Sequence, residues 1–261
     1  MNVEGADLTR LFAALVISTL RFGPALSMCP ATNDSMISGT ARRCVMLAFS
    51  ILALPAVTAG MPREFFVPTL AVVAVKETLI GAVIGFFASI PFWVAENIGN
   101  FIDNQRGATM GEVYSPLSGS QESPTAVFFT QTVASIFYVS GAVFLFLAAV
   151  YKSYEVWPVF GGFFRFSPDA PVQLLGTLGG MLKTTVVISA PVIIVMFLAT
   201  LGLGFVNRTA PQLNVFFLSM PIKSGMAVAM LIIYLPFIID KLMYTSDGEI
   251  LKPALKLMGG G

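Results

Sequence analysis

Long apolar segments, separated by short polar breaks, take up most of this 261-residue chain. Six of them can be recognised, at roughly 11–28, 44–59, 65–95, 126–151, 184–206 and 213–239. Only 11% of the residues are charged, whereas a typical soluble domain has about 25%. The pattern therefore predicts an all-α, membrane-type protein whose helices pack mainly on one another.

Only two of these segments have the length of a simple membrane span. A bilayer core of about 30 Å needs about 20 apolar residues in a helix, and 126–151 and 184–206 provide them. Segment 44–59 is short, and 213–239 is interrupted by two prolines and a lysine, which predicts two short helices or a broken hairpin. We therefore expect kinked helices and helical hairpins.

Charged residues inside the apolar segments mark positions that need a polar partner. Arg21 lies in the first segment, and the adjacent Lys76 and Glu77 lie in the third. A charge at such depth is costly against lipid and normally faces protein or a water-filled cavity. Buried helix or subunit contacts are therefore expected for Lys76 and Glu77.

A second group of polar residues surrounds Pro211, which prevents a continuous helix between the last two segments. This turn is either a solvated loop or a hydrogen-bonded joint between subunits. Under the second alternative, its candidate contact residues are Arg208, Gln212, Asn214 and Lys223.

Small residues recur every four positions in the third segment, at Gly81, Gly85 and Ser89. This spacing places them on one face of a helix, where small residues let two helix backbones approach closely. Glycine is also common in membrane helices that have no such contact. We predict a helix-packing strip, with chance occurrence as the alternative.

Two carboxylates follow the third segment at helical spacing. Glu96, Asn100 and Asp103 would share one polar face of a continuing helix. Such a face could bind a cation or relay protons, as in a secondary transporter or proton channel. It could equally be the water-exposed side of an amphipathic helix, or face a pore or a partner subunit.

Several classes of function are excluded or made remote by the composition. Histidine is absent, which removes the commonest general base and metal ligand, and no nucleophile or nucleotide-binding motif is found. Cys29 and Cys44 fit no zinc spacing. The 15 basic and 14 acidic residues nearly cancel, which argues against nucleic acid as a partner. We expect no catalytic residues, cofactor or metal.

Two polar stretches carry a family resemblance. They are ENIGNFIDNQRGATMGEVYSPLSGSQESP at 96–124 and NRTAPQLNVFFLSMPIK at 207–223. Together with SYEVWPV at 153–159 and KETLIGAVIGF from Lys76, they resemble the FliR/SctT export-apparatus family of type III secretion systems over roughly 8–242. The sequence IDNQRGATM and the tryptophan of SYEVWP are more similar to the injectisome branch than to the flagellar branch.

The resemblance implies a core component of an export gate in the bacterial inner membrane, at the base of the secretion machine. One copy would join R-type and S-type subunits and other export-apparatus proteins around an entry pore for secreted polypeptides in transit. It also implies contact with membrane lipid, and helices that lie largely above the membrane plane although they look transmembrane.

The resemblance further implies a division of the chain into an R-subunit-like part at 1–180, an S-subunit-like helical hairpin at 181–245 and a C-terminal tail at 246–261, with the fusion point near 170–185. A loop near 104–121 would project into the pore as part of its plug. Its residues include Asn104, Gln105, Arg106, Gly107, Ala108, Thr109, Met110, Gly111, Glu112, Tyr114, Ser115, Pro116, Ser118 and Gly119.

Overall fold

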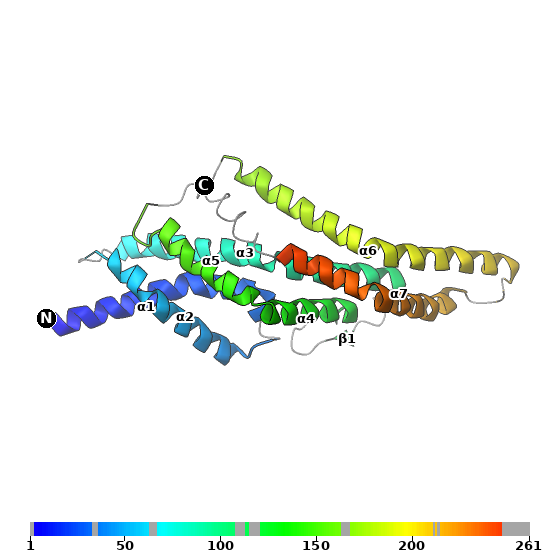
Figure 1. The fold of residues 1–261 in the computed structure, drawn as a ribbon, viewed down its shortest axis with the longest axis horizontal. Coiled ribbons are helices and arrows are strands. Elements are labelled where there is room, and N and C mark those ends of the chain that lie inside the picture. Colours follow the sequence, from blue (N-terminus) through cyan, green and yellow to red (C-terminus); the bar gives the residue numbers. More distant parts are fainter. Residues whose placement is uncertain are drawn as a thin grey trace. The chain divides into compact units, whose positions relative to one another are not determined.

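The computed structural model describes residues 3–32, 36–62, 67–107, 113–114, 121–162, 168–210, 212 and 215–246. Over these ranges the chain is almost entirely helical (Figure 1), which confirms the all-α prediction. The elements are α1 (Val3–Met28), the 3-10 turn η1 (Pro30–Thr32), α2 (Gly39–Ala59), α3 (Val67–Arg106), β1 (Val113–Tyr114), β2 (Gln121–Glu122), α4 (Pro124–Val139), α5 (Ala142–Val156), α6 (Ala170–Thr209) and α7 (Val215–Ser246).

Five of the described helices are long and apolar enough to cross a membrane, namely α1, α2, α3, α6 and α7. Together, α4 and α5 would make a sixth span, but they meet at a bend of 73°. The prediction of a simple span over 126–151 is therefore wrong. The break falls at Gly141, which has a φ of 77°, a left-handed conformation that glycine adopts without steric cost.

The last apolar segment also differs from its prediction. Instead of two short helices or a broken hairpin, α7 continues through Pro221 and Pro236. Proline removes one backbone hydrogen bond and bends a helix, yet membrane-type helices tolerate it where other groups satisfy the freed carbonyl. The Pro- and Gly-rich stretch at 170–185 is likewise helical, because α6 begins at Ala170.

Two compact units make up the described chain, and α3, α4 and α6 each contribute residues to both. Among the described residues, unit 1 contains those in Met1–Ile90 and Phe137–Leu175. Its core packs α1 closely against the first part of α3. A Cβ atom added at Gly81 would overlap the Arg21 carbonyl oxygen, and one at Gly85 would come within 2.8 Å of the Ala25 carbonyl oxygen.

In unit 1, the contact between α1 and α3 continues for one more helical turn, to Ser89. The Ser89 hydroxyl lies 2.6 Å from the carbonyl oxygens of both Met28 and Gly85, which share its single hydrogen. The three small residues thus lie along one side of α3, against α1. α1 also packs on α5, where the Phe22 ring lies edge-on to the Tyr151 ring, with centroids 5.3 Å apart.

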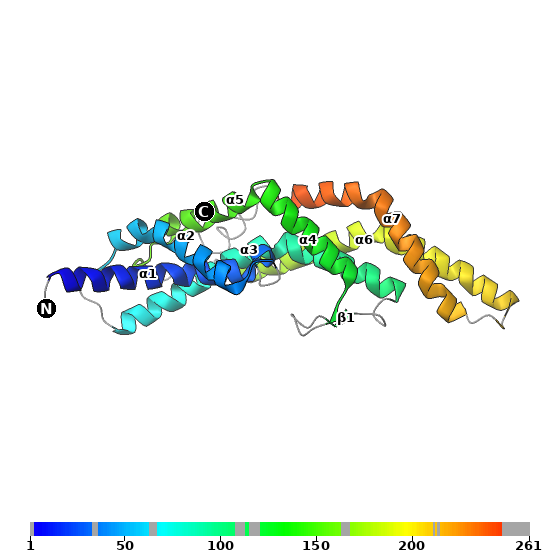
Figure 2. The ribbon, with the colours of Figure 1, turned by 90° about the horizontal axis from the view of Figure 1, so that it is seen from below.

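Unit 2 contains the described residues of Pro91–Ile136 and Gly176–Ser246. The second part of α3 packs on α4, and this contact again depends on a glycine, because a Cβ at Gly99 would overlap the backbone of Thr125 and Ala126. In Figures 1 and 2, the C-terminal part of α6 runs beside the N-terminal part of α7. This helix pair buries few of its side chains within the chain: 22% over the apolar part of α6 and 11% over that of α7.

Candidate functional site

A buried ion pair lies at the centre of unit 1, between α1 and α3. The Arg21 guanidinium faces the Glu77 carboxylate in a two-point arrangement, with Nε to Oε2 at 2.6 Å and Nη2 to Oε1 at 2.8 Å. Both side chains have no solvent exposure. A bidentate Arg–carboxylate pair is strong and fixes geometry as well as charge. The relative position of α1 and α3 is therefore specified at this point.

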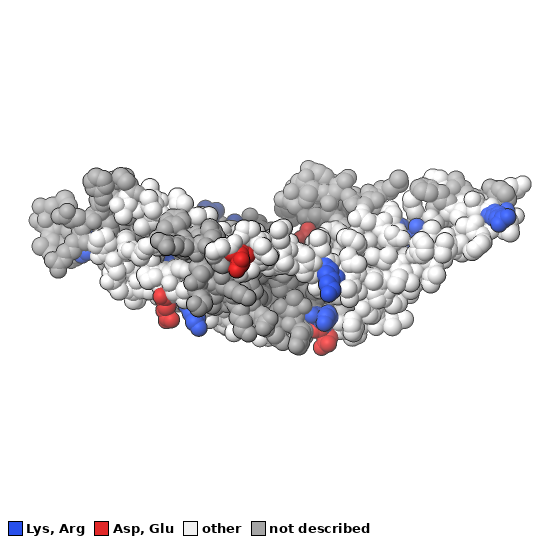
Figure 3. Space-filling model, turned by 90° about the horizontal axis from the view of Figure 1, so that it is seen from above, with Lys and Arg blue, Asp and Glu red and all other residues white. Residues whose placement is uncertain are grey.

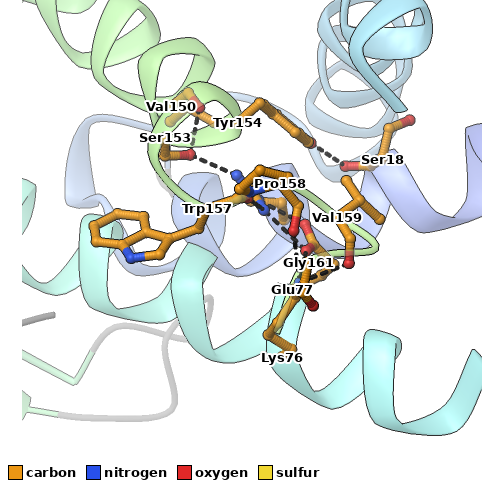
Figure 4. A network of polar contacts seen from close by, with 11 residues as sticks. Ser18, Lys76, Glu77, Val150, Ser153, Tyr154, Trp157, Pro158, Val159 and Gly161 are labelled. Carbon is orange, nitrogen blue, oxygen red and sulfur yellow. Dashed lines mark hydrogen bonds and ion pairs between the residues drawn. The ribbon is translucent and has the colours of Figure 1, made fainter. Parts of the chain in front are cut away.

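The same guanidinium also holds the C-terminal end of α5. Its Nη1 donates to the Ser153 hydroxyl at 2.9 Å, and its Nη2 donates to the Trp157 carbonyl oxygen at 2.9 Å. Its central carbon lies 3.9 Å from the centroid of the Tyr154 ring, which is cation–π distance. Figure 4 shows the Trp157 side chain pointing away from this network, so the residue takes part through its backbone.

Lys76 completes the network from the neighbouring position on α3. Its ammonium donates to the carbonyl oxygens of Pro158 at 2.7 Å, Val159 at 2.6 Å and Gly161 at 3.4 Å (Figure 4). It also lies 3.9 Å from Glu77 Oε1. An ammonium has three hydrogens to donate, and the turn after α5 supplies an acceptor for each. Lys76 and Arg21 thus fix the turn at residues 157–161 from two sides.

A second buried carboxylate lies in unit 2, where α3 approaches the start of α4. Asp103 is only 2% exposed. Its Oδ2 accepts the backbone N–H of Thr125 at 2.9 Å and the hydroxyl of Ser123. Its Oδ1 accepts the Thr125 hydroxyl at 2.6 Å and lies 2.7 Å from Nε of Arg106 in an ion pair. We call these four residues the Asp103 cluster.

The Asp103 cluster lies where both adjoining helices end. α3 ends at Arg106, and the next residue, Gly107, has a φ of 79° and an N–H bond to the Asn104 carbonyl at 3.2 Å, both typical of a helix terminus. α4 starts with Pro124, and proline is favoured at the first helical position. Between the helices, β1 and β2 pair antiparallel, with Val113 opposite Glu122.

The predicted polar face of α3 is not uniform in the structure. Glu96 is exposed, Asn100 is half-buried and Asp103 is buried. The interpretation of this face as simply water-exposed is therefore wrong at Asp103, because α4 covers that position and supplies hydrogen-bond donors to its carboxylate.

The remaining predicted residues divide into three groups. Asn104 and Gln105 end α3 beside the Asp103 cluster, and Tyr114 belongs to β1. Within this chain Arg208 and Gln212 are exposed and Lys223 is half-buried, so their role in subunit contacts stays a prediction. The others lie outside the described residues: Ala108, Thr109, Met110, Gly111, Glu112, Ser115, Pro116, Ser118, Gly119 and Asn214.

Sequence reasoning missed the partners of these buried charges. It noted Arg21 as a charge in the first apolar segment but did not pair it with Glu77 in the third, although opposite charges in two apolar segments are a usable signal. It also missed Ser123 and Thr125 as partners of Asp103. Ser123 before Pro124 is a recognisable helix start. Among the described residues, no group of three or more metal-ligating side chains lies together.

Comparison with known proteins gives one consistent answer. Residues 12–247 match the family described as "Bacterial export proteins, family 1". The chain is 38% identical over 215 residues to the Yop proteins translocation protein T of Yersinia pestis, which covers 82% of each chain. It is 28% identical over 228 residues to the surface presentation of antigens protein SpaR of Salmonella typhimurium (87% of this chain, 85% of the relative). It is 32% identical over 190 residues to the flagellar biosynthetic protein FliR of Bacillus subtilis (71% and 73%).

Proposed function

Because this chain belongs to family 1 of the bacterial export proteins, as a type III secretion export apparatus protein of the SctT/FliR kind, we propose that it forms part of the entry pore of the export gate. The predicted family is confirmed, and so is the preference for the injectisome branch. The chain is a multi-pass membrane protein of the secretion apparatus, and its family implies transport rather than catalysis.

The observation that carries this proposal is the length of the apolar helices. α3 and α6 have 40 residues each, which at 1.5 Å per residue is about 60 Å, or about twice the hydrocarbon thickness of a bilayer. Along α6, large apolar side chains are exposed from Val172 to Val206. Ordinary helix tilt, up to about 40°, does not fit so long a stripe into lipid.

Part of this apolar surface must therefore be covered by protein. Among the described residues that Figure 3 draws on this face, only scattered ones are charged. We propose that the covering helices come from R-type and S-type subunits, with one copy of this chain per gate. Other export-apparatus proteins would complete the assembly at the base of the secretion machine, in the bacterial inner membrane.

The proposal keeps the division into an R-like part at 1–180 and an S-like hairpin at 181–245, which the pairing of α6 with α7 supports (Figures 1 and 2). It also assigns the plug of the pore to the loop near 104–121. A plug must block ions and yield to an unfolded polypeptide, and the glycines and small polar residues of this loop suit that task.

The transporter alternative receives no support from the geometry. A proton relay or cation site needs a carboxylate with free acceptor positions, whereas Asp103 already accepts from Ser123 and Thr125 and pairs with Arg106. Reconstitution separates the two functions. The purified chain alone should give no pH-dependent flux in liposomes, and such flux would contradict the pore-component proposal.

The direct test of the proposal has two parts. Co-expressed with the two small hydrophobic subunits of its own secretion system, the chain should purify with both in one stable complex. Deletion of Gly107–Gln121 from that complex should then raise the ion conductance of membranes that contain it. Failure to copurify would overturn the assembly, and unchanged conductance in an intact complex would overturn the plug.

A further inference from the structure

One carboxylate holds both sides of the segment that links α3 to α4. Arg106 approaches Asp103 from the end of α3, whereas Ser123 and Thr125 approach it from the start of α4. The two hydroxyls and the Thr125 N–H donate to the two oxygens of a side chain that is 2% exposed, and the Arg106 guanidinium adds an ion pair to Oδ1. Hydrogen bonds in such a buried network strengthen one another, and an unsatisfied member is costly. The two sides are therefore held together as one unit.

This arrangement does more than cap a helix. The ordinary cap of α4 is Ser123, whose hydroxyl oxygen accepts the backbone N–H of Ala126 at 3.3 Å, as a residue just before a helix commonly does. Asp103 instead reaches this cap from a different helix, twenty positions earlier in the chain. One turn below, Gly99 lets the α3 backbone approach Ala126. The end of α3 is thus held to the start of α4 at two successive turns, by the Asp103 carboxylate at one and by close backbone packing at Gly99 at the other.

We propose that Asp103 is a positioning residue, which sets where the segment between Gly107 and Glu122 leaves and re-enters the helices, and that the resting ion conductance of the assembled gate depends on its carboxylate. The conductance part of this inference rests on the proposed function of that segment as a plug. The positioning part rests only on the described contacts of the Asp103 cluster.

The chain carries a convenient reporter of this joint. Arg106 is the only Lys or Arg between Lys76 and Lys152, so tryptic cleavage after it gives fragments that mass spectrometry can assign. Its side chain is 16% exposed and paired with Asp103. The cleavage rate at Arg106, measured on the purified complex, therefore reports how often the end of α3 is released.

Asp103→Asn is the sharpest variant, because it keeps the shape but removes the charge and places amide hydrogens among groups that already donate. We expect cleavage after Arg106 to become about tenfold faster, which corresponds to about 1.4 kcal/mol of lost local stability. Thr125→Val, which removes one hydroxyl donor, should give a smaller increase. Thr132→Val is the matched control, because within the described part of the chain the Thr132 hydroxyl bonds the Phe128 carbonyl of its own helix, at 2.8 Å, and no residue of the Asp103 cluster.

Conductance of membranes containing the same variants completes the test. Faster cleavage with raised resting conductance in Asp103→Asn and Thr125→Val, and neither in Thr132→Val, would support the proposal. Unchanged cleavage in Asp103→Asn would overturn the positioning role, and faster cleavage with unchanged conductance would overturn the link to the pore. The Gly107–Gln121 deletion separates the two ideas: if it raises conductance and Asp103→Asn does not, the plug stands and the conductance part of the inference about Asp103 fails.

Discussion

The buried charges of unit 1 and unit 2 make similar contacts, but they connect different parts of the chain. In unit 1, Arg21 and Glu77 are 56 positions apart, and Arg21 also reaches Trp157 across 136 positions. In unit 2, the partners of Asp103 among the described residues all lie within 22 positions of it. The first network therefore joins helices that are distant in sequence, whereas the second closes a single helix–loop–helix connection.

This difference shows where each charge should matter. Removing one member of a buried ion pair leaves the other charge uncompensated, which is far more costly than losing an exposed pair. In unit 1 such a loss would act on the packing of α1, α3 and α5 together. In unit 2 it would act on one joint, and the helices on either side would keep their other contacts. The variants below test this contrast.

The largest effect is expected from Glu77→Ala in unit 1. Arg21 would then stay buried with a positive charge and no carboxylate, at a cost of about 3–5 kcal/mol. We expect the variant chain to be depleted from the export-gate complex, as seen on a native gel. Glu155→Ala is the control, because Glu155 also lies in unit 1 and is exposed.

A double variant sharpens this result. Replacing both members of the pair by apolar residues, as in Arg21→Met with Glu77→Leu, removes the buried guanidinium together with its carboxylate, while Lys76 keeps its bonds to the carbonyl oxygens of the turn after α5. This variant should restore part of the lost assembly. If Glu77→Ala assembled like the unchanged chain, the network would not be needed for the fold of unit 1. The contrast with Asp103 would then have no basis.

The next largest effect is expected from replacing one closely packed glycine in each unit. Gly81→Ala would push a methyl group into the backbone of α1, and Gly99→Ala would push one into the backbone of α4. Overpacking of this kind typically costs about 1–3 kcal/mol. Gly179→Ala is the matched control, because no described atom of this chain lies within 4 Å of the added Cβ at that position. The measurement is the thermal stability of the purified complex.

The two glycine variants should also change different properties of the complex. Gly81→Ala should resemble a weak form of Glu77→Ala, with reduced assembly, since both disturb the contact of α1 with α3. Gly99→Ala should resemble Asp103→Asn, with faster tryptic cleavage after Arg106. Equal stability of Gly81→Ala, Gly99→Ala and Gly179→Ala would contradict the close helix approach in both units.

The sequence predicted the helical class well, because apolar segments and helix length depend on composition and local periodicity. It also directed attention to Lys76 and Glu77, since charges in apolar segments are costly without a partner. It did not predict the partners, because the pairing of Glu77 with Arg21 depends on how α1 and α3 pack, which no local pattern encodes. The bend at Gly141 and the continuity of α7 through its prolines were missed for a similar reason, since Gly and Pro permit more than one backbone path.

The smallest effect concerns Cys29, which lies directly after α1 in unit 1 and has no solvent exposure. Burial disfavours the thiolate and raises the pKa of the Cys29 thiol to about 11, and the thiolate is the reactive form. Below that pH the thiol stays protonated, so its reaction with maleimide should be slow near neutral pH and should accelerate as the pH rises toward 11. A Cys44→Ser background leaves Cys29 as the only cysteine, and the denatured chain gives the reference rate.

Cys29 labelling then distinguishes the two units in one measurement. The end of α1 is held to α3 by the bond from Ser89 to the Met28 carbonyl, so Glu77→Ala should speed labelling by loosening that contact. Asp103→Asn should leave the labelling rate unchanged, because Asp103 belongs to the other unit and acts on the start of α4. Equal acceleration by both variants would mean that the two charge networks stabilise one cooperative structure, and the distinction between a packing network and a local joint would be lost.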